Sequence, residues 1–98
     1  MIDFGISGRK ALICGGSSGL GYGCAEALAK CGVKLILNSR NEARLQKACN
    51  SLRQKTSAEI VLAEADITTD DGRKLVMEKA GDVDILANNS WEAPHWLF

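Results

Sequence analysis

The stretch Cys14-Gly15-Gly16-Ser17-Ser18-Gly19-Leu20-Gly21 lies between a run of apolar residues and a segment with helical spacing. Gly15 would let the chain turn sharply as it leaves a strand, and Gly19 would let backbone approach a phosphate without an intervening Cβ. Gly21 would let the helix pack closely on the sheet. The start of that helix offers free N–H groups and a positive dipole end. The stretch predicts a phosphate-binding turn; the alternative is a glycine-rich turn with no ligand.

Short apolar segments rich in Ile, Val and Leu recur along the chain, as in strands that are buried on both faces. They cover residues 11–14, 33–37, 60–63 and 83–87. Stretches with apolar residues at helical spacing lie between them, at residues 20–31, 42–55 and 70–80. Asn41 is placed to cap the second helix, Gly72 weakens the third, and Gly32 and Gly81 stand where C-caps are expected. This alternation predicts a parallel sheet with right-handed crossovers.

The composition excludes several classes of protein. The chain has 98 residues, 46% of them hydrophobic, and twelve basic residues balance twelve acidic ones. A neutral chain lacks the basic excess of a nucleic-acid binder, and no apolar run reaches the ~18 residues of a membrane span. The N-terminus has no apolar core of a secretory signal. No C-x-x-C pair or nearby His accompanies the cysteines, so we expect reduced thiols in a cytoplasmic protein; they are Cys14, Cys24, Cys31 and Cys49.

The glycine spacing is Gly-x-x-x-Gly-x-Gly, formed by Gly15, Gly19 and Gly21. With it, residues 1–90 resemble the N-terminal half of an NAD(P)-binding domain of the short-chain dehydrogenase/reductase family. The resemblance implies a Rossmann-type, doubly wound, three-layer α/β fold with strand order 3-2-1-4. It also implies NADP-dependent interconversion of a carbonyl and an alcohol. Residues 3–11 resemble the leader of bacterial 3-oxoacyl reductases. The family's first motif starts with Thr, so Cys14 loses a hydroxyl that braces the turn.

The residues after the second strand bear on which nucleotide is bound. A carboxylate about 20 residues past the glycines usually holds a ribose 2′-hydroxyl. This chain reads Asn38-Ser39-Arg40-Asn41 there, and Arg40 can pair with a 2′-phosphate in a bidentate way. The pattern favours NADP over NAD. Two observations leave this open: Arg40 is also an ordinary loop residue, and Ser18 stands where NADP-using relatives often have a basic residue.

Two further motifs match the family. Asp66-Ile67-Thr68 follows the third strand; by resemblance, Asp66 would accept a hydrogen bond from the adenine amino group and Ile67 would pack on the ring. The alternative is that Asp66 and Thr68 simply start the next helix. Asn88-Asn89-Ser90 follows the fourth strand and would lie beside the cofactor. The predicted cofactor contacts are Gly15, Ser17, Ser18, Gly19, Leu20, Gly21, Ser39, Arg40, Asp66, Ile67, Asn88 and Asn89.

The chain contains no set of catalytic residues. In the family, a Tyr protonates the developing alkoxide, a Lys four residues later lowers the pKa of that Tyr, and a Ser positions the carbonyl. In full-length relatives these residues lie beyond position 98. Tyr22 is followed four residues later by Glu26, so we expect it to be structural, and His95 has no orienting partner. We expect a truncated chain that is inactive alone. The alternative is a non-catalytic module that binds a nucleotide, or pairs with a partner or itself through an exposed fourth strand.

The last eight residues differ in composition from the rest. Residues 91–98 hold both Trp, the only His and the only Pro, whereas residues 1–90 contain none of these. Trp is encoded only by UGG, and a shift of one base turns the codons of residues 91–96 into a set rich in Gly and Pro. We therefore divide the chain into residues 1–90, the dinucleotide-binding half-domain, and residues 91–98, a tail that we hypothesise to be frameshifted.

Overall fold

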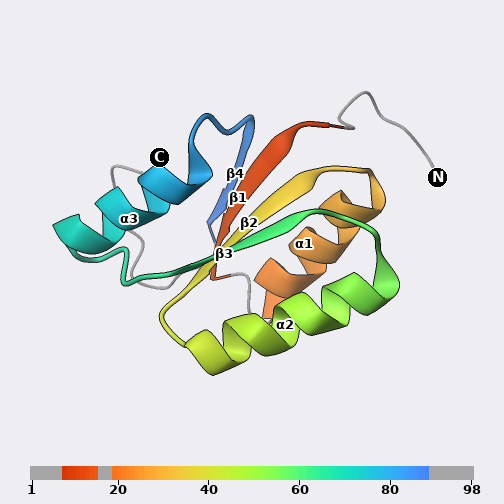
Figure 1. Cartoon of the computed structure of the whole chain (residues 1–98), viewed down its shortest axis with the longest axis horizontal. Helices are drawn as coiled ribbons and strands as arrows, with labels where there is room; N and C mark the ends of the chain where they lie inside the picture. The colour runs from red at the N-terminus through yellow and green to blue at the C-terminus, as the bar shows by residue number, and fades with distance from the viewer. Residues whose placement is uncertain (1–7, 16–18, 89–98) are drawn as a thin grey trace.

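Strands and helices alternate along the part of the chain that the structure, a computed structural model, describes: residues 8–15 and 19–88 (Figure 1). The predicted order of elements is confirmed. The bounds are β1 Lys10–Cys14, α1 Gly19–Lys30, β2 Lys34–Ser39, α2 Glu42–Lys55, β3 Ile60–Glu64, α3 Asp70–Ala80 and β4 Ile85–Asn88. The predictions for residues outside these ranges, including the hypothesis of a frameshifted tail at 91–98, lie outside the described residues.

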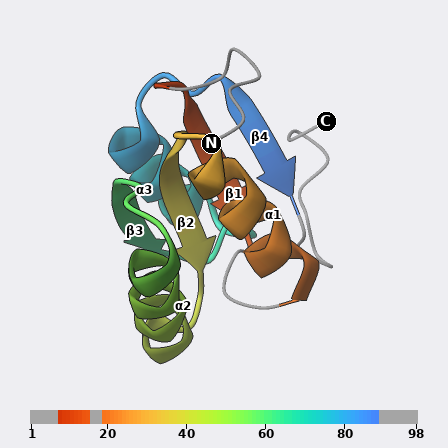
Figure 2. The same cartoon turned by 90° about the vertical axis from the view of Figure 1, so that its right-hand side faces the viewer.

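The strands form one parallel sheet with the order β3-β2-β1-β4, as predicted. Ala11 at the start of β1 pairs with Leu35 of β2 on one side and Ile85 of β4 on the other. Helices α1 and α2 cover one face of the sheet and α3 covers the other, which gives three layers (Figures 1 and 2). The fold is therefore the Rossmann-like, doubly wound α/β architecture that the sequence predicts.

Strands β1 and β2 are buried on both faces, which explains their uninterrupted apolar runs. Successive residues of a strand point to opposite faces. Ala11 and Ile13 of β1 therefore join the cluster under α1 and α2, while Leu12 and Cys14 join the cluster under α3. The helices contribute one apolar stripe each. The buried residues of α2 are Leu45, Ala48, Cys49 and Leu52, and those of α3 are Gly72, Val76 and Ala80.

The helix caps were predicted from the sequence and are confirmed. Asn41 is the N-cap of α2, and its side-chain oxygen accepts a hydrogen bond from the Arg44 amide at 3.0 Å. Gly81 is the C-cap of α3, with its amide donating to the Met77 carbonyl. Gly32 follows α1 and donates to the Ala29 carbonyl.

The fourth strand starts later than the sequence predicts, at Ile85 rather than Val83. Asp84 is the reason. Its carboxylate accepts a hydrogen bond from the Lys10 amide at 3.0 Å, and its own amide donates to the Lys10 carbonyl. The side chain of Asp84 thereby occupies the Lys10 amide, which a longer strand would have paired. The regular pairing of β4 with β1 then begins at Ile85, the residue after Asp84.

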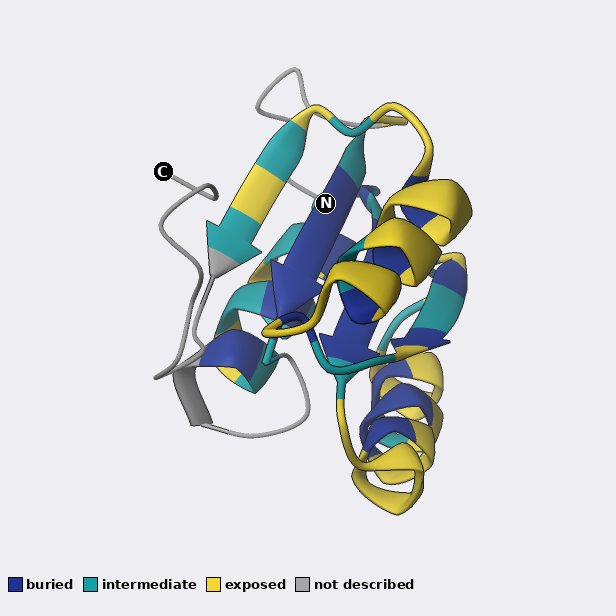
Figure 3. Cartoon of the chain, turned by 90° about the vertical axis from the view of Figure 1, so that its left-hand side faces the viewer, coloured by how far each residue is buried: buried dark blue, intermediate teal, exposed yellow. Residues whose placement is uncertain are grey.

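Strand β4 lies at an edge of the sheet formed by the described residues and pairs there with β1 alone. Leu86 in its middle has 44% of its surface exposed, and α3 lies over the other strands and leaves β4 uncovered (Figure 3). No helix within residues 8–15 and 19–88 is long and apolar enough to cross a membrane.

Tyr22 joins α1 to α2. Its hydroxyl lies 2.6 Å from the Ser51 hydroxyl and accepts a hydrogen bond from the Lys55 ammonium at 3.1 Å. The same ammonium lies 5.1 Å from the centre of the Tyr22 ring and forms an ion pair with Glu26 at 2.9 Å. These contacts give Tyr22 the structural role expected from the sequence.

We predict that Tyr22→Phe lowers the free energy of unfolding by about 1 kcal/mol, because the hydroxyl makes both polar contacts to α2. Chemical denaturation measures this. Ser51→Ala removes one partner of the same pair, so the double variant should cost less than the sum of the two single variants. Replacing the exposed Gln46 with Ala is the control, with a change below about 0.5 kcal/mol. Strict additivity of Tyr22→Phe and Ser51→Ala would contradict the contact.

Candidate functional site

The carboxyl ends of all the strands meet at one edge of the sheet, because the strands are parallel. From β1 the chain crosses to β2 on one side, while β4 returns to the other side of β1. This reversal of strand order is where open α/β sheets bind ligands, in the crevice beyond the strand ends. The predicted site residues follow these strand ends, so the structure brings the described ones to a common edge.

The glycine turn leaves β1 at this edge. Gly15 has φ +77°, a left-handed conformation that favours glycine, and its amide donates to the Asn38 carbonyl at 2.9 Å. Gly19 begins α1, Leu20 follows it, and Gly21 is buried. The first turn of α1 carries no acidic residue that would repel an anion. The predicted contacts Ser17 and Ser18 lie outside the described residues.

Cys14 ends β1 and is only 1% exposed. It packs in the core cluster under α3, beside Leu12 and Ile36. Burial raises the pKa of the Cys14 thiol to about 11, because an apolar environment penalises the thiolate. This cysteine is therefore a core side chain at neutral pH, without the thiolate that a nucleophile or a metal ligand requires.

The loop after β2 holds the residues predicted to select the nucleotide. Arg40 is exposed, and Ser39 before it is half-buried. The Ser39 hydroxyl accepts a hydrogen bond from the Asn41 amide at 3.2 Å, and the Ser39 carbonyl accepts one from the Ala65 amide at 3.1 Å. This loop is thereby tied to the loop after β3.

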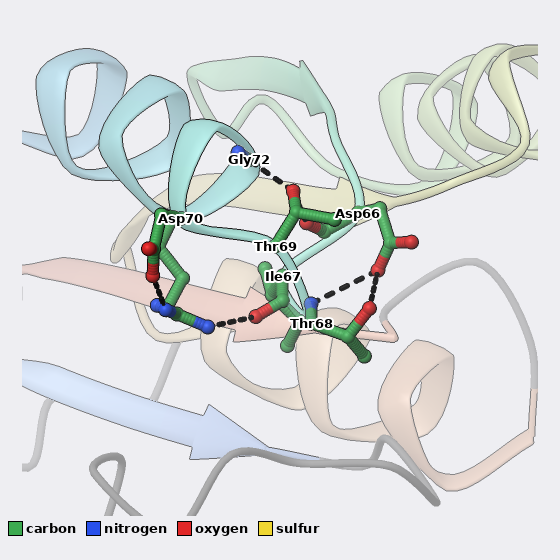
Figure 4. A network of polar contacts seen from close by, with 7 residues as sticks. Asp66, Ile67, Thr68, Thr69, Asp70 and Gly72 are labelled. Atoms are coloured by element: carbon green, nitrogen blue, oxygen red, sulfur yellow. Dashed lines mark hydrogen bonds and ion pairs between the residues drawn. The ribbon is translucent and has the colours of Figure 1, made fainter.

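Asp66 lies in that second loop, and Thr68 holds one of its oxygens. Its Oδ1 accepts hydrogen bonds from the Thr68 amide at 2.9 Å and the Thr68 hydroxyl at 2.6 Å (Figure 4). These bonds lower the pKa of Asp66 below its ordinary value, and the positive charge of Arg40 lowers it further. Asp66 is therefore ionised at neutral pH. The hydrogen bond from the Ala65 amide to the Ser39 carbonyl holds the loops that carry Arg40 and Asp66 together.

Ile67 and Thr69 have structural roles in this loop. The side chain of Ile67 is 6% exposed and packs in the core cluster under α3, so it is not placed on an open surface where a base could stack. Thr69 is the N-cap of α3, and its hydroxyl accepts a hydrogen bond from the Gly72 amide at 3.0 Å (Figure 4). Because Thr69 caps the helix, neither Asp66 nor Thr68 does so.

Asn38 is a residue that the sequence analysis did not single out as a site residue. It is 2% exposed, and its side-chain nitrogen donates to the carbonyls of Ala63 at 2.9 Å and Ala65 at 3.1 Å. The signal in the sequence is a single amide at the end of the apolar run Leu35–Leu37. A buried polar group needs partners, and here they come from the neighbouring strand and loop.

The remaining predicted contacts follow β4. Asn88 is the last residue of this strand and pairs with Cys14, at the same edge as the glycine turn. Asn89 lies outside the described residues. Within residues 8–15 and 19–88, no group of three or more His, Cys, Asp or Glu side chains could hold a metal ion. The cysteines at 14, 24, 31 and 49 are free thiols.

A parallel sheet with a glycine turn at its reversal of strand order defines a dinucleotide-binding α/β domain. The family model for short chain dehydrogenases matches residues 9–91, and the chain belongs to that family.

Relatives of known activity are much longer than this chain. The chain is 36% identical to 17-beta-hydroxysteroid dehydrogenase type 3 of Danio rerio over 84 residues, which are 84% of this chain and 27% of that protein. It is 33% identical to very-long-chain 3-oxoacyl-CoA reductase of Rattus norvegicus, over 92% of this chain and 30% of that one. L-sorbose reductase from Gluconobacter frateurii, solved with NADPH and L-sorbose, superposes with a TM-score of 0.86 and 35% identity, over 98% of this chain and 41% of that one.

Gly72 lies where the Asp66 loop packs on α3. A Cβ added at Gly72 would lie 1.8 Å from the Asp66 carbonyl oxygen, which is backbone and has no room to move aside alone. The glycine that weakens the third helix in the sequence is therefore required by the loop that carries Asp66.

We predict that Gly72→Ala lowers the free energy of unfolding by about 1–3 kcal/mol, because the contact with Asp66 outweighs the better helix propensity of Ala. Thermal or chemical unfolding measures this. Gly23→Ala is the matched control, since a Cβ there meets nothing within 4 Å. It should raise stability by up to about 1 kcal/mol. Equal effects of the two substitutions would rule out the clash.

The buried Cys14 thiol predicts a loss of stability at high pH. Its pKa is about 11 in the folded chain and 9.0 ordinarily, so the folded state keeps the proton that the unfolded state releases. The stability that the buried, protonated thiol contributes is fully present below about pH 9 and is lost as the pH rises toward about 11. From pH 9 to 11, the free energy of unfolding should fall by up to about 2 kcal/mol more in the wild type than in Cys14→Ala. Parallel pH profiles would contradict this.

Proposed function

We propose that this chain forms the cofactor-binding part of an NADP-dependent oxidoreductase that interconverts a carbonyl and an alcohol. The proposal is supported by the reversal of strand order at β1 and by Gly15, Arg40 and Asp66, which follow the carboxyl ends of three parallel strands. Membership of the short chain dehydrogenase family and the NADPH in the structure of L-sorbose reductase support it.

The pyrophosphate would lie at the start of α1. Gly15 has a left-handed conformation at the end of β1, and no carboxylate stands in the first turn of α1. Exposed amides at a helix N-terminus bind phosphate groups through hydrogen bonds and the helix dipole. In this proposal Gly15, Ser17, Ser18, Gly19, Leu20 and Gly21 surround the phosphates.

Arg40 would bind the 2′-phosphate that distinguishes NADP from NAD, with Ser39 beside it. The loop after β2 offers no carboxylate to hold a free ribose 2′-hydroxyl. Arg40 is exposed and makes no ion pair with any residue that the structure describes. Its guanidinium can therefore donate hydrogen bonds to a phosphate without first breaking an ion pair.

Asp66 would receive the adenine amino group. Thr68 occupies Oδ1, whereas Oδ2 has no hydrogen-bond partner among the described residues. The carboxylate is ionised, so a bond from an amino group to Oδ2 would be charge-assisted. Ile67 would contribute through its backbone, because its side chain packs in the core. Asn88 and Asn89 would border the cofactor from the end of β4.

A bound NADPH supplies the hydride that reduces a carbonyl carbon. The developing alkoxide then needs a proton, which the family resemblance assigns to a Tyr assisted by a Lys and a Ser. Residues 1–98 contain no Tyr-x-x-x-Lys, since Tyr22 is the only tyrosine and Glu26 follows it. We therefore propose that these 98 residues bind the cofactor without turning over substrate.

We propose carbonyl compounds and alcohols as the substrate class, and 3-oxoacyl thioesters as the narrower candidate within it. The relatives named above include a steroid dehydrogenase, a sorbose reductase and a 3-oxoacyl-CoA reductase. The similarity of residues 3–11 to bacterial 3-oxoacyl reductases favours the last of these. Free cysteines support the further proposal of a reducing, cytoplasmic location.

The alternative is a module that binds a nucleotide, or pairs with a partner or a second copy, and has no catalytic role. The exposed Leu86 on the open edge of β4 favours pairing, because an uncovered apolar edge strand offers unpaired backbone groups to another strand.

The deciding experiment measures NADPH and NADH binding to the 98-residue chain and to Arg40→Ala. We expect the wild type to prefer NADPH, and Arg40→Ala to weaken NADPH binding about tenfold or more with little change for NADH. Arg53→Ala, an exposed arginine on α2, is the matched control and should change neither. An unchanged preference in Arg40→Ala would remove the role of Arg40. Binding of neither dinucleotide by the wild type would overturn the proposed function, and turnover of a simple ketone would overturn the binding-only proposal.

A further inference from the structure

Asn38 is the one polar side chain that is fully buried among the residues the structure describes. Its side-chain nitrogen has two hydrogens, and both are used, one on the Ala63 carbonyl and one on the Ala65 carbonyl. Carbonyl oxygens only accept hydrogen bonds, so the nitrogen of the amide must face them and the oxygen must face away. The orientation of this side chain is thus fixed by chemistry.

The two carbonyls that Asn38 holds are not equivalent. Ala63 lies within β3 and pairs with Asn38 in the register of the sheet. Ala65 lies just past the end of β3, and its amide donates to the Ser39 carbonyl of β2 at 3.1 Å. The side chain of Asn38 therefore adds a second attachment to β2, on the carbonyl of the residue that directly precedes Asp66.

The backbone of Asn38 holds the opposite side of the site. Its carbonyl accepts the hydrogen bond from Gly15, the residue that starts the glycine turn. One residue thus binds the turn after β1 through its backbone and the loop after β3 through its side chain. A dinucleotide that contacts both the turn and Asp66 must match the distance between them, and both segments are attached to Asn38.

Burying an apolar side chain at position 38 would cost less free energy, because a buried amide loses its hydrogen bonds to water and needs partners within the protein. The neighbouring buried residues of β2, Leu35, Ile36 and Leu37, are all apolar. The polar exception stands at the position where the strand reaches the candidate site.

We propose that Asn38 is a positioning residue for recognition of the adenine base. It acts through Ala65 to hold Asp66 at the distance from the Gly15 turn that a bound dinucleotide requires. This inference rests on the proposed function, in which Asp66 accepts a hydrogen bond from the adenine amino group.

The test compares NADPH with its hypoxanthine analogue, which has a carbonyl oxygen in place of the adenine amino group. The wild-type chain should bind NADPH about tenfold more tightly than the analogue, the effect of one charge-assisted hydrogen bond. Asn38→Ala removes both donors and should reduce this preference to about twofold or less. Asn38→Leu, an apolar side chain of similar size with no donor, should reduce the preference to the same extent.

The ratio of the two affinities separates positioning from a general loss of stability. A smaller folded fraction weakens binding of both ligands by the same factor and leaves their ratio unchanged. Ile60→Val, a core substitution at the start of β3, is the matched control: it should lower the melting temperature without changing the ratio.

Each outcome bears on the proposal. A preference that stays near tenfold in both Asn38 variants would overturn the positioning role and leave the proposed function intact. A wild-type chain that binds both ligands equally would refute the contact between Asp66 and adenine, and the positioning role with it. No binding of NADPH by the folded wild type would overturn the proposed function itself. Loss of preference in the Asn38 variants alone supports the inference.

Discussion

The hydrogen bond from the Gly15 amide to the Asn38 carbonyl joins the ends of the two central strands. Gly15 also has φ +77°, so a residue with a Cβ at this position would strain the turn. The side chain of Asn38 then carries the same constraint to the loop after β3. The described part of the candidate site is therefore held together mainly by hydrogen bonds to backbone atoms.

Packing on the far side of the sheet supports these attachments. Cys14, Ile67 and Val76 belong to one apolar cluster under α3, and the loop that carries Asp66 runs over it. Gly72 lets the first turn of α3 approach the Asp66 carbonyl closely. The residues that face a ligand in the proposal are thus supported by side chains packed in the core. This explains why Ile67 fills the core although it stands beside a polar site.

The sequence was informative where local rules decide the structure. Apolar runs without alternation predicted strands covered on both faces, and the residues at 15, 41 and 81 predicted a turn, an N-cap and a C-cap that the structure contains. It failed where distant segments meet. The late start of β4 depends on the Asp84 carboxylate reaching the Lys10 amide, 74 residues away. The role of Asn38 depends on carbonyls of another strand, and no spacing within β2 indicates them.

The contact between Lys10 and Asp84 also bears on the order in which the chain folds. Strands β1, β2 and β3 follow one another, and each pair is linked by a single helix. Strand β4 pairs with β1 instead of β3, so its docking closes a much longer loop. Because the entropy of closing a loop grows with its length, β1 to β3 should associate first and β4 should join last. In this order of folding, β1 is an edge strand until β4 pairs with its free side.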